Sequence, residues 1–136
     1  MDDYNAQVIE EFRANRGVVG GHFEGAHVVL VHTVGRRSGK KVIKPLLYLP
    51  DDDAFLLVGS AGGAEKEPQW VANLEAMGEV TIEVGERTLT AKPTVLRDGP
   101  ERDRLYPRFI EYWPDLLEYQ THTDRTFPVV RLDPLG

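Results

Sequence analysis

The sequence predicts an α+β fold in which six antiparallel β-strands curl into a small barrel and helices pack against its outside. Three observations lead to this expectation. The hydrophobic patterns follow the order helix, three strands, helix, two strands, helix, strand, and the strands are joined by short turns. The chain of 136 residues also has the length of one domain, without a linker or a repeat. We therefore expect residues 1–136 to form a single domain.

The first helix is predicted over residues 3–15. The apolar side chains there are spaced as one stripe of an amphipathic helix: Tyr4, Val8, Ile9 and Phe12. Glycines 17, 20 and 21 end this helix. Residues 27–33 are nearly all apolar and rich in β-branched side chains, which predicts a strand buried on much of both faces.

Residues 42–50 and 54–60 predict two further strands. The acidic turn of residues 51–53 separates them, and its side chains favour local hydrogen bonds with the backbone. Because short links join the three strands, we expect them to form an antiparallel meander.

Pro68 suits the first position of a second helix, whose apolar stripe runs to Met77 and which Gly78 closes. Residues 80–84 and 87–96 alternate between apolar and polar side chains, which predicts a hairpin. Pro93 indicates a bulge or an edge position within it.

A third helix is predicted from residues 98–100 to Pro114, with a kink at Pro107, which lacks an N–H group. Its inward-facing side chains are Leu105, Tyr106, Phe109, Ile110 and Trp113. A short helical turn around residues 116–119 and a terminal strand over residues 127–132 complete the chain.

Composition excludes several classes of function. The chain has 16 lysines and arginines against 22 acidic residues, a net charge of −6, which disfavours nucleic acids as partners. The absence of cysteine excludes disulfides and thiolate chemistry and fits a reducing cytosol. The four histidines lack the spacing of a metal site, so we expect no metal. We find neither a signal peptide nor an apolar run long enough to span a membrane.

Positive charge gathers in one segment of this acidic chain. Five cations fall within nine residues that contain no acid: Arg36, Arg37, Lys40, Lys41 and Lys44. Gly35 and Gly39 place them on a tight turn, where backbone N–H groups and arginine forks bind phosphate or carboxylate. A solvated hairpin tip is the alternative interpretation.

A glycine-bearing loop between residues 60 and 70 leaves a predicted strand and leads into a predicted helix. Such a loop allows a backbone to approach a ligand closely, although its glycines could equally relieve steric crowding. It lacks the sequence of a phosphate-binding P-loop and of a dinucleotide fingerprint. Four aromatic residues can either line a site for a flat ligand or belong to the core: Trp70, Tyr112, Trp113 and Tyr119.

Three stretches taken together resemble the deazaflavin-dependent nitroreductase family: residues 33–49, 58–76 and 118–130. Members of this family are split β-barrel proteins that use coenzyme F420, an 8-hydroxy-5-deazaflavin. The resemblance thus implies a six-stranded antiparallel split β-barrel with flanking helices. The chain departs from the family pattern in two places. Family members often have a cation near the position of Val42, and nitroreducing members have tyrosines at the positions of Trp113 and Leu116.

The resemblance also implies roles for individual residues. The phosphate of the cofactor is expected on Gly35, Arg36, Arg37, Ser38 and Gly39, and its polyglutamate tail along Lys40, Lys41 and Lys44. The ring is expected against Pro45, Leu46, Ser60, Ala61, Gly62 and Gly63, with Lys66, Trp70 and Asn73 behind it. The substrate side is expected to be lined by Trp113, Leu116 and Tyr119.

The activity that the resemblance implies is hydride transfer from reduced F420 to a quinone, an enone or a nitroaromatic compound. Ser60 and Tyr119 are the candidate catalytic residues, which donate hydrogen bonds or a proton to the acceptor. An FMN-binding flavoprotein and a non-catalytic carrier of an anionic cofactor are the alternatives. Barrel edges and exposed aromatic residues permit a homodimer.

Overall fold

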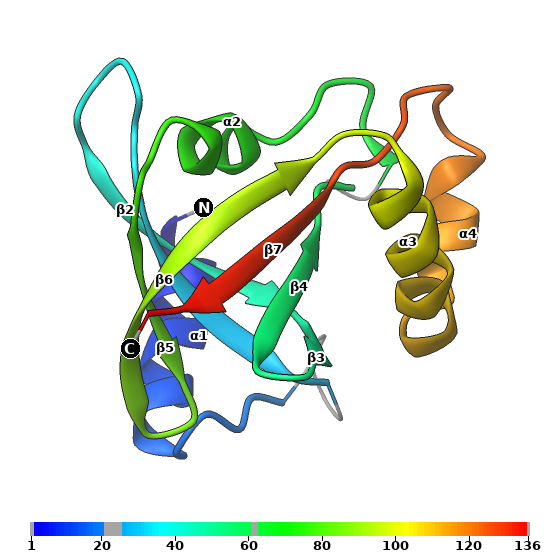
Figure 1. The fold of residues 1–136 in the computed structure, drawn as a ribbon. Helices are drawn as coiled ribbons and strands as arrows, with labels where there is room; N and C mark the ends of the chain where they lie inside the picture. The colour runs from blue at the N-terminus through cyan, green and yellow to red at the C-terminus, as the bar shows by residue number, and fades with distance from the viewer. Residues whose placement is uncertain (1, 21–25, 61–62, 136) are drawn as a thin grey trace.

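The computed structural model describes residues 2–20, 26–60 and 63–135, and for residues 2–4 the backbone alone. The side chain of Tyr4 therefore lies outside the description, as do Gly21, Ala61 and Gly62. The helices and strands are, in chain order, α1 (Asp2–Ala14), β1 (Val28–Val34), β2 (Lys41–Leu47), β3 (Leu49–Asp51), β4 (Ala54–Val58), α2 (Gln69–Glu75), β5 (Val80–Val84), β6 (Arg87–Leu96), α3 (Pro100–Tyr112), α4 (Asp115–Gln120) and β7 (Val129–Pro134). Figure 1 shows α3 and α4 beside each other on one side of a curled sheet, with α2 across one end.

The sheet has seven strands in the order β2-β1-β5-β6-β7-β4-β3, and every pair is antiparallel. The two edge strands, β2 and β3, are separated in the chain by Tyr48 alone. The sheet must therefore curl until its two edges approach each other. The predicted α+β fold with a curled antiparallel sheet and flanking helices is confirmed.

The prediction of one strand over residues 42–50 is wrong in one respect. The segment breaks at Tyr48 into two strands, β2 and β3, so the sheet has seven strands instead of six. β2 pairs with β1, whereas β3 pairs with β4 at the other end of the sheet, so the three predicted strands do not form a simple meander. Pro45 and Pro50 are tolerated since both lie in edge strands. Pro93 likewise has a partner on one side only, because β5 pairs with β6 no further than Ala91.

Strands β1, β4 and β7 bury residues on both of their faces, as predicted for residues 27–33. Val29 and Val31 of β1 face the main core inside the curled sheet, whereas Val28 and Leu30 pack against Val8 and other apolar residues of the α1 side. The same alternation in β4 and β7 sends one face of each strand inward and the other toward α3 and α4.

Helices α3 and α4 bury the predicted apolar residues. Leu105 and Phe109 of α3 are buried, and Tyr106, Ile110 and Trp113 pack against the same cluster. Within the described residues no helix is long and apolar enough to cross a membrane. Nor do those residues bring three potential metal ligands together.

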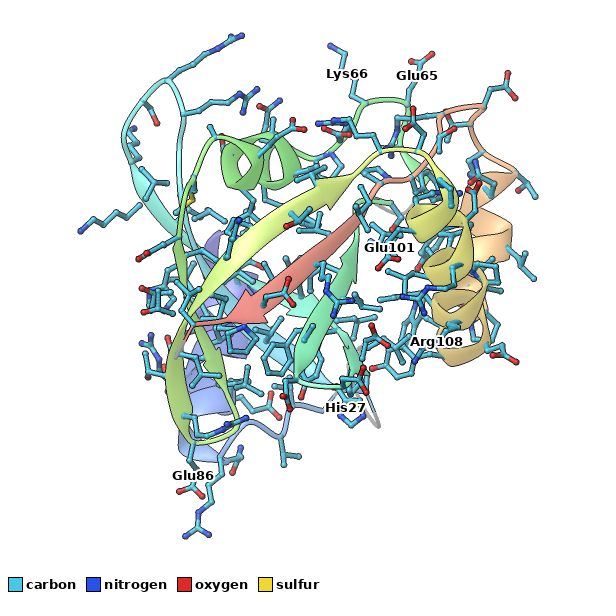
Figure 2. The ribbon with its side chains drawn as sticks, in the orientation of Figure 1. His27, Glu65, Lys66, Glu86, Glu101 and Arg108 are labelled. Carbon is cyan, nitrogen blue, oxygen red and sulfur yellow. The ribbon has the colours of Figure 1, made fainter. Side chains whose placement is uncertain are left out.

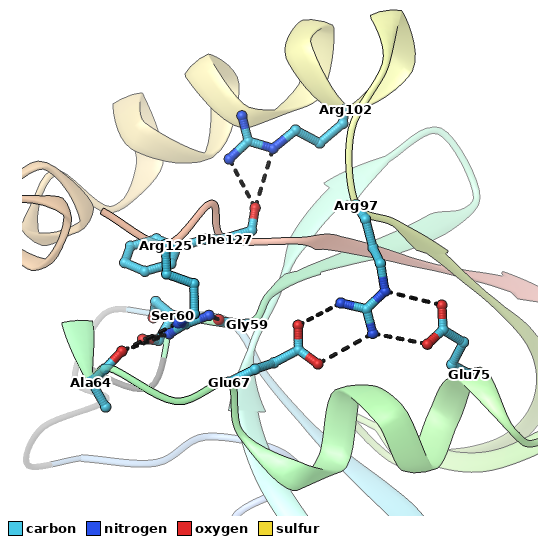
Figure 3. A network of polar contacts seen from close by, with 9 residues as sticks. All are labelled: Gly59, Ser60, Ala64, Glu67, Glu75, Arg97, Arg102, Arg125 and Phe127. Atoms are coloured by element: carbon cyan, nitrogen blue, oxygen red, sulfur yellow. Dashed lines mark hydrogen bonds and ion pairs between the residues drawn. The ribbon is translucent and has the colours of Figure 1, made fainter. Parts of the chain in front are cut away.

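Helix α2 is short and is fixed at both ends by one arginine. The predicted helix over residues 68–77 is trimmed, with Pro68 as its N-cap and Glu75 as its last residue. Arg97, which follows β6, donates hydrogen bonds to Glu67 just before the helix and to Glu75 at its end, at 2.6–3.2 Å (Figure 3). Apolar burial of Trp70, Val71 and Leu74 supplies the rest of the attachment.

Asp51 belongs to the acidic turn whose side chains were expected to bond the local backbone, yet its partners are distant and its side chain is only 11% exposed. Its two carboxylate oxygens accept hydrogen bonds from Arg108 of α3 at 2.6 Å and from Arg131 of β7 at 2.8 Å. These two arginines hold the pKa of Asp51 below its ordinary value. Asp51 therefore ties α3 to the edge of the sheet.

Replacing Asp51 by asparagine is expected to lower the free energy of unfolding by about 1–3 kcal/mol at neutral pH. Because the folded-state pKa is depressed, this stabilisation is complete above the carboxyl pKa of the unfolded chain, about 4, and is lost as the pH falls through the lower folded value. Urea denaturation of both proteins from neutral pH down to about pH 3 measures the effect. The two stability curves should converge toward acid, and parallel curves would contradict the assignment.

Candidate functional site

The cationic turn is a closed loop between β1 and β2. Gly35 N donates to Lys40 O at 2.8 Å, and Gly39 N donates to Gly35 O at 2.9 Å. Gly39 has a φ of +71°, and a Cβ atom on Gly35 would lie 2.5 Å from Ser38 Oγ. The positive φ favours glycine at position 39, and the missing side chain of Gly35 leaves room for the Ser38 hydroxyl. The turn leaves Arg36, Arg37 and Ser38 exposed at its tip.

Helix α2 holds this turn through Asn73. Asn73 Oδ1 accepts hydrogen bonds from the backbone N of Arg36 at 3.2 Å and from Arg36 Nη1 at 2.7 Å. One amide oxygen thus fixes both the backbone and the guanidinium of Arg36. Arg36 is thereby held in the lining of the pocket that opens between the turn and α2.

This pocket has a volume of about 590 Å³ and lies between the turn, β2 and the start of α2. Its charged lining residues are all cations: Arg36, Arg37, Lys40 and Lys44. The other lining residues are Thr33, Gly35, Ser38, Val42, Pro68, Gln69, Trp70 and Asn73, so the described lining contains no acid. A pocket of this kind attracts an anionic ligand and offers apolar surface from Val42, Pro68 and Trp70.

Several residues that the resemblance assigned to the cofactor lie elsewhere. Lys41 lines a different pocket, with His32 and Glu79, because successive side chains of β2 point to opposite faces. Pro45 is buried, and Leu46 packs against the main core. Lys66 is exposed on the connection from β4 to α2 and extends away from the molecule (Figure 2).

An arginine that the sequence analysis did not single out holds the glycine-bearing segment after β4 through its backbone carbonyls. Arg125 donates hydrogen bonds to the carbonyl oxygens of Gly59, Ser60 and Ala64 (Figure 3). We call Gly59, Ser60, Gly63 and Ala64 the shelf; the predicted contacts of Ala61 and Gly62 lie outside the described residues.

The shelf packs tightly against α4. Gly63 has a φ of +88°, and a Cβ atom there would lie 2.5 Å from the carbonyl oxygen of Tyr119. Tyr119, which is half-buried, therefore borders the shelf. Trp113, also half-buried, packs against the apolar cluster of α3 and α4. Leu116 is 1% exposed and packs in the cluster beneath α3 and α4, so the structure does not bring it to a substrate surface.

Sequence reasoning missed Arg125 and Arg97, which act through contacts 22–66 residues away in the chain. Arg125 lies within the third of the resembling stretches, and this was the one signal that could have drawn attention to it. An isolated arginine in a polar segment carries no information about its partners. Asn73 was included among the expected residues, but its contact with Arg36 was not foreseen.

Comparison with known proteins decides the family. The model of the F420H(2)-dependent quinone reductase family matches residues 5–134. This chain belongs to that family. The predicted resemblance to F420-dependent proteins is therefore confirmed, and coenzyme F420 is the cofactor that the family description names.

Individual members and solved structures agree with the family assignment. F420H(2)-dependent quinone reductase Rv1261c of Mycobacterium tuberculosis is 36% identical over 125 residues, covering 89% of this chain and 83% of the relative. The solved F420-H2 dependent reductase FDR-A has a TM-score of 0.69 at 34% identity, covering 78% of this chain and 93% of that chain. A chain described as a domain-swapped dimer has a TM-score of 0.72 at 29% identity, covering 97% and 98%.

Proposed function

We propose that this protein is an F420H2-dependent quinone reductase. The observation that carries the proposal is the acid-free pocket between the cationic turn and α2. Coenzyme F420 combines a flat ring with a phosphate and a tail of glutamates. The four lining cations suit the phosphate and the tail, while Trp70 and the glycines of the shelf suit the ring.

Each residue of the site has a proposed role. Arg36, Arg37 and Ser38 bind the phosphate with charge-assisted hydrogen bonds, and Asn73 fixes Arg36 in place for this task. Lys40 and Lys44 attract the carboxylates of the tail. The charge of the turn therefore determines affinity, and the shelf determines where the ring lies.

When bound, the reduced deazaflavin supplies a hydride from its carbon 5 to the acceptor. The protein holds the ring face and the acceptor in contact and donates hydrogen bonds to the acceptor oxygen as negative charge develops there. Ser60 Oγ and Tyr119 Oη are the proposed donors, and Trp113 lines the acceptor side. Enones and nitroaromatic compounds are proposed as further acceptors, since they accept a hydride at a conjugated position.

Turnover of reduced F420 with a quinone tests this function. The protein, F420H2 and menadione are mixed without oxygen, and the visible absorbance of oxidised F420 is followed. We expect its return at a rate proportional to the protein concentration. No return with menadione or with any quinone, enone or nitro compound tested would contradict the activity and favour a carrier.

The assembly state is also proposed. The likeness to a chain described as a domain-swapped dimer supports a homodimer. Light scattering after size-exclusion chromatography measures the mass of the protein against the 15.3 kDa of one chain. A mass of one chain at all concentrations would contradict the dimer.

A further inference from the structure

Arg125 directs its guanidinium at the shelf. Its Nη1 donates to Gly59 O at 3.0 Å, its Nη2 to Ser60 O at 2.9 Å and to Ala64 O at 3.1 Å, and its Nε to Ala64 O at 3.2 Å. These three carbonyls lie on both sides of residues 61–62. One side chain therefore sets the separation between the two ends of the glycine-bearing segment.

The guanidinium is itself held in a fixed orientation. It lies over the ring of Phe127, with 4.8 Å between Arg125 Cζ and the ring centroid. Burial lowers the pKa of Arg125, and no described carboxylate forms a hydrogen bond with it. The carbonyls, together with the negative charge of Glu67, therefore stabilise the charged guanidinium.

The backbone of Arg125 is fixed from the helical side. Gln120 Nε2 at the end of α4 donates to Arg125 O at 2.9 Å and to Thr123 O at 3.2 Å. Tyr106 Oη of α3 donates in turn to Gln120 Oε1 at 3.2 Å. A continuous set of hydrogen bonds thus connects α3 and α4, which border the proposed acceptor side, with the shelf.

The cationic turn is held independently of this network. Its support comes from Asn73 of α2, and none of the described contacts of Arg36 or Asn73 involves Arg125. The structure therefore has two separate supports, one beneath the proposed phosphate site and one beneath the proposed ring site.

We propose that Arg125 is a positioning residue for the deazaflavin ring, because it holds the shelf in the shape that supports this ring. The inference rests on the proposed function and deepens it. Recognition of F420 then divides into two parts: Arg125 governs the ring, and the cationic turn governs the phosphate and tail. The two parts respond to different substitutions.

Fluorescence titrations with two ligands test this division. The ligands are F420 and 8-hydroxy-5-deazariboflavin, which has the ring but neither the phosphate nor the glutamates. Arg125→Lys keeps the charge but loses the planar fork, so the affinity for the tail-less ligand should fall about tenfold. Arg37→Glu should change the affinity for the tail-less ligand by less than about twofold while strongly weakening F420 binding.

Arg102→Lys is the matched control. Arg102 donates two hydrogen bonds to Phe127 O at 2.8 and 3.2 Å (Figure 3). It also lies over the ring of Tyr106, and none of its described contacts involves the shelf. It should lower the melting temperature without changing the affinity for the tail-less ligand. Hydrogen exchange of residues 59, 60, 63 and 64 should accelerate in Arg125→Lys but not in Arg102→Lys.

Wild-type affinity of Arg125→Lys for the tail-less ligand would overturn the proposal. So would equal losses of affinity in Arg125→Lys and Arg102→Lys, because they would show a general effect on folding. A wild-type protein that binds neither ligand would overturn the proposed function itself and this inference with it. If the wild-type protein binds both ligands and the two variants, Arg125→Lys and Arg37→Glu, lose affinity for F420 and the tail-less ligand in the same proportion, only the role of Arg125 is overturned.

Discussion

Replacing Arg37 by glutamate is expected to weaken F420 binding by about two to three orders of magnitude. Arg37 lies at the tip of the turn and lines the acid-free pocket. The substitution removes charge-assisted hydrogen bonds, each of about 1.5–3 kcal/mol, and adds a carboxylate beside the phosphate. Fluorescence titration of F420 against the purified variant measures the loss.

Lys41→Glu is the matched control for this prediction. It reverses the same charge a short way further along the chain, but Lys41 faces another pocket from the opposite side of β2. Its effect on F420 affinity should be less than about fivefold, the size of a screened long-range interaction. Equal affinities of wild-type protein and Arg37→Glu for F420 would refute the phosphate assignment.

Replacing Gly63 by alanine is expected to reduce the free energy of unfolding by about 2–5 kcal/mol. Two effects add at this position. The φ of +88° is unfavourable for a residue with a side chain, and the new Cβ would lie 2.5 Å from Tyr119 O and 3.0 Å from Tyr119 Cα. Because these are backbone atoms, relief requires the shelf and α4 to separate.

Gly39→Ala separates the two effects. Gly39 has a similar φ of +71°, but a Cβ atom added there would meet no described atom within 4 Å. Gly39→Ala should therefore lower the free energy of unfolding only through the unfavourable positive φ, by about 1–2 kcal/mol. Urea denaturation of both variants gives the comparison, and equal losses at Gly39 and Gly63 would show that the close packing of the shelf on α4 is not as described.

Local patterns in the sequence were sufficient for most of the secondary structure. The hairpin of β5 and β6 follows the predicted residues 80–84 and 87–96 because its alternation and turn are both local signals. The break at Tyr48 was missed since a change of partner strand leaves no mark on a continuous apolar run. The role of Asp51 was missed for a similar reason, because its arginine partners lie 57 and 80 residues away.

The sequence predicted which types of residue form the site better than it predicted how they are arranged in space. Cations between glycines indicated an anion site, and the structure places Arg36, Arg37 and Lys44 around one pocket. The period of two along β2 could have separated Lys41 from Lys44, had the strand's register been known. Arg125 and the burial of Leu116 depend on tertiary contacts that no local pattern contains.

A structure of the protein in complex with F420 tests the central claim most directly. We expect the phosphate within hydrogen-bonding distance of Arg37 and Ser38, and the ring against the shelf beside Trp70. A complex in which the cationic turn faces bulk solvent while the ring binds in another part of the molecule would contradict the account.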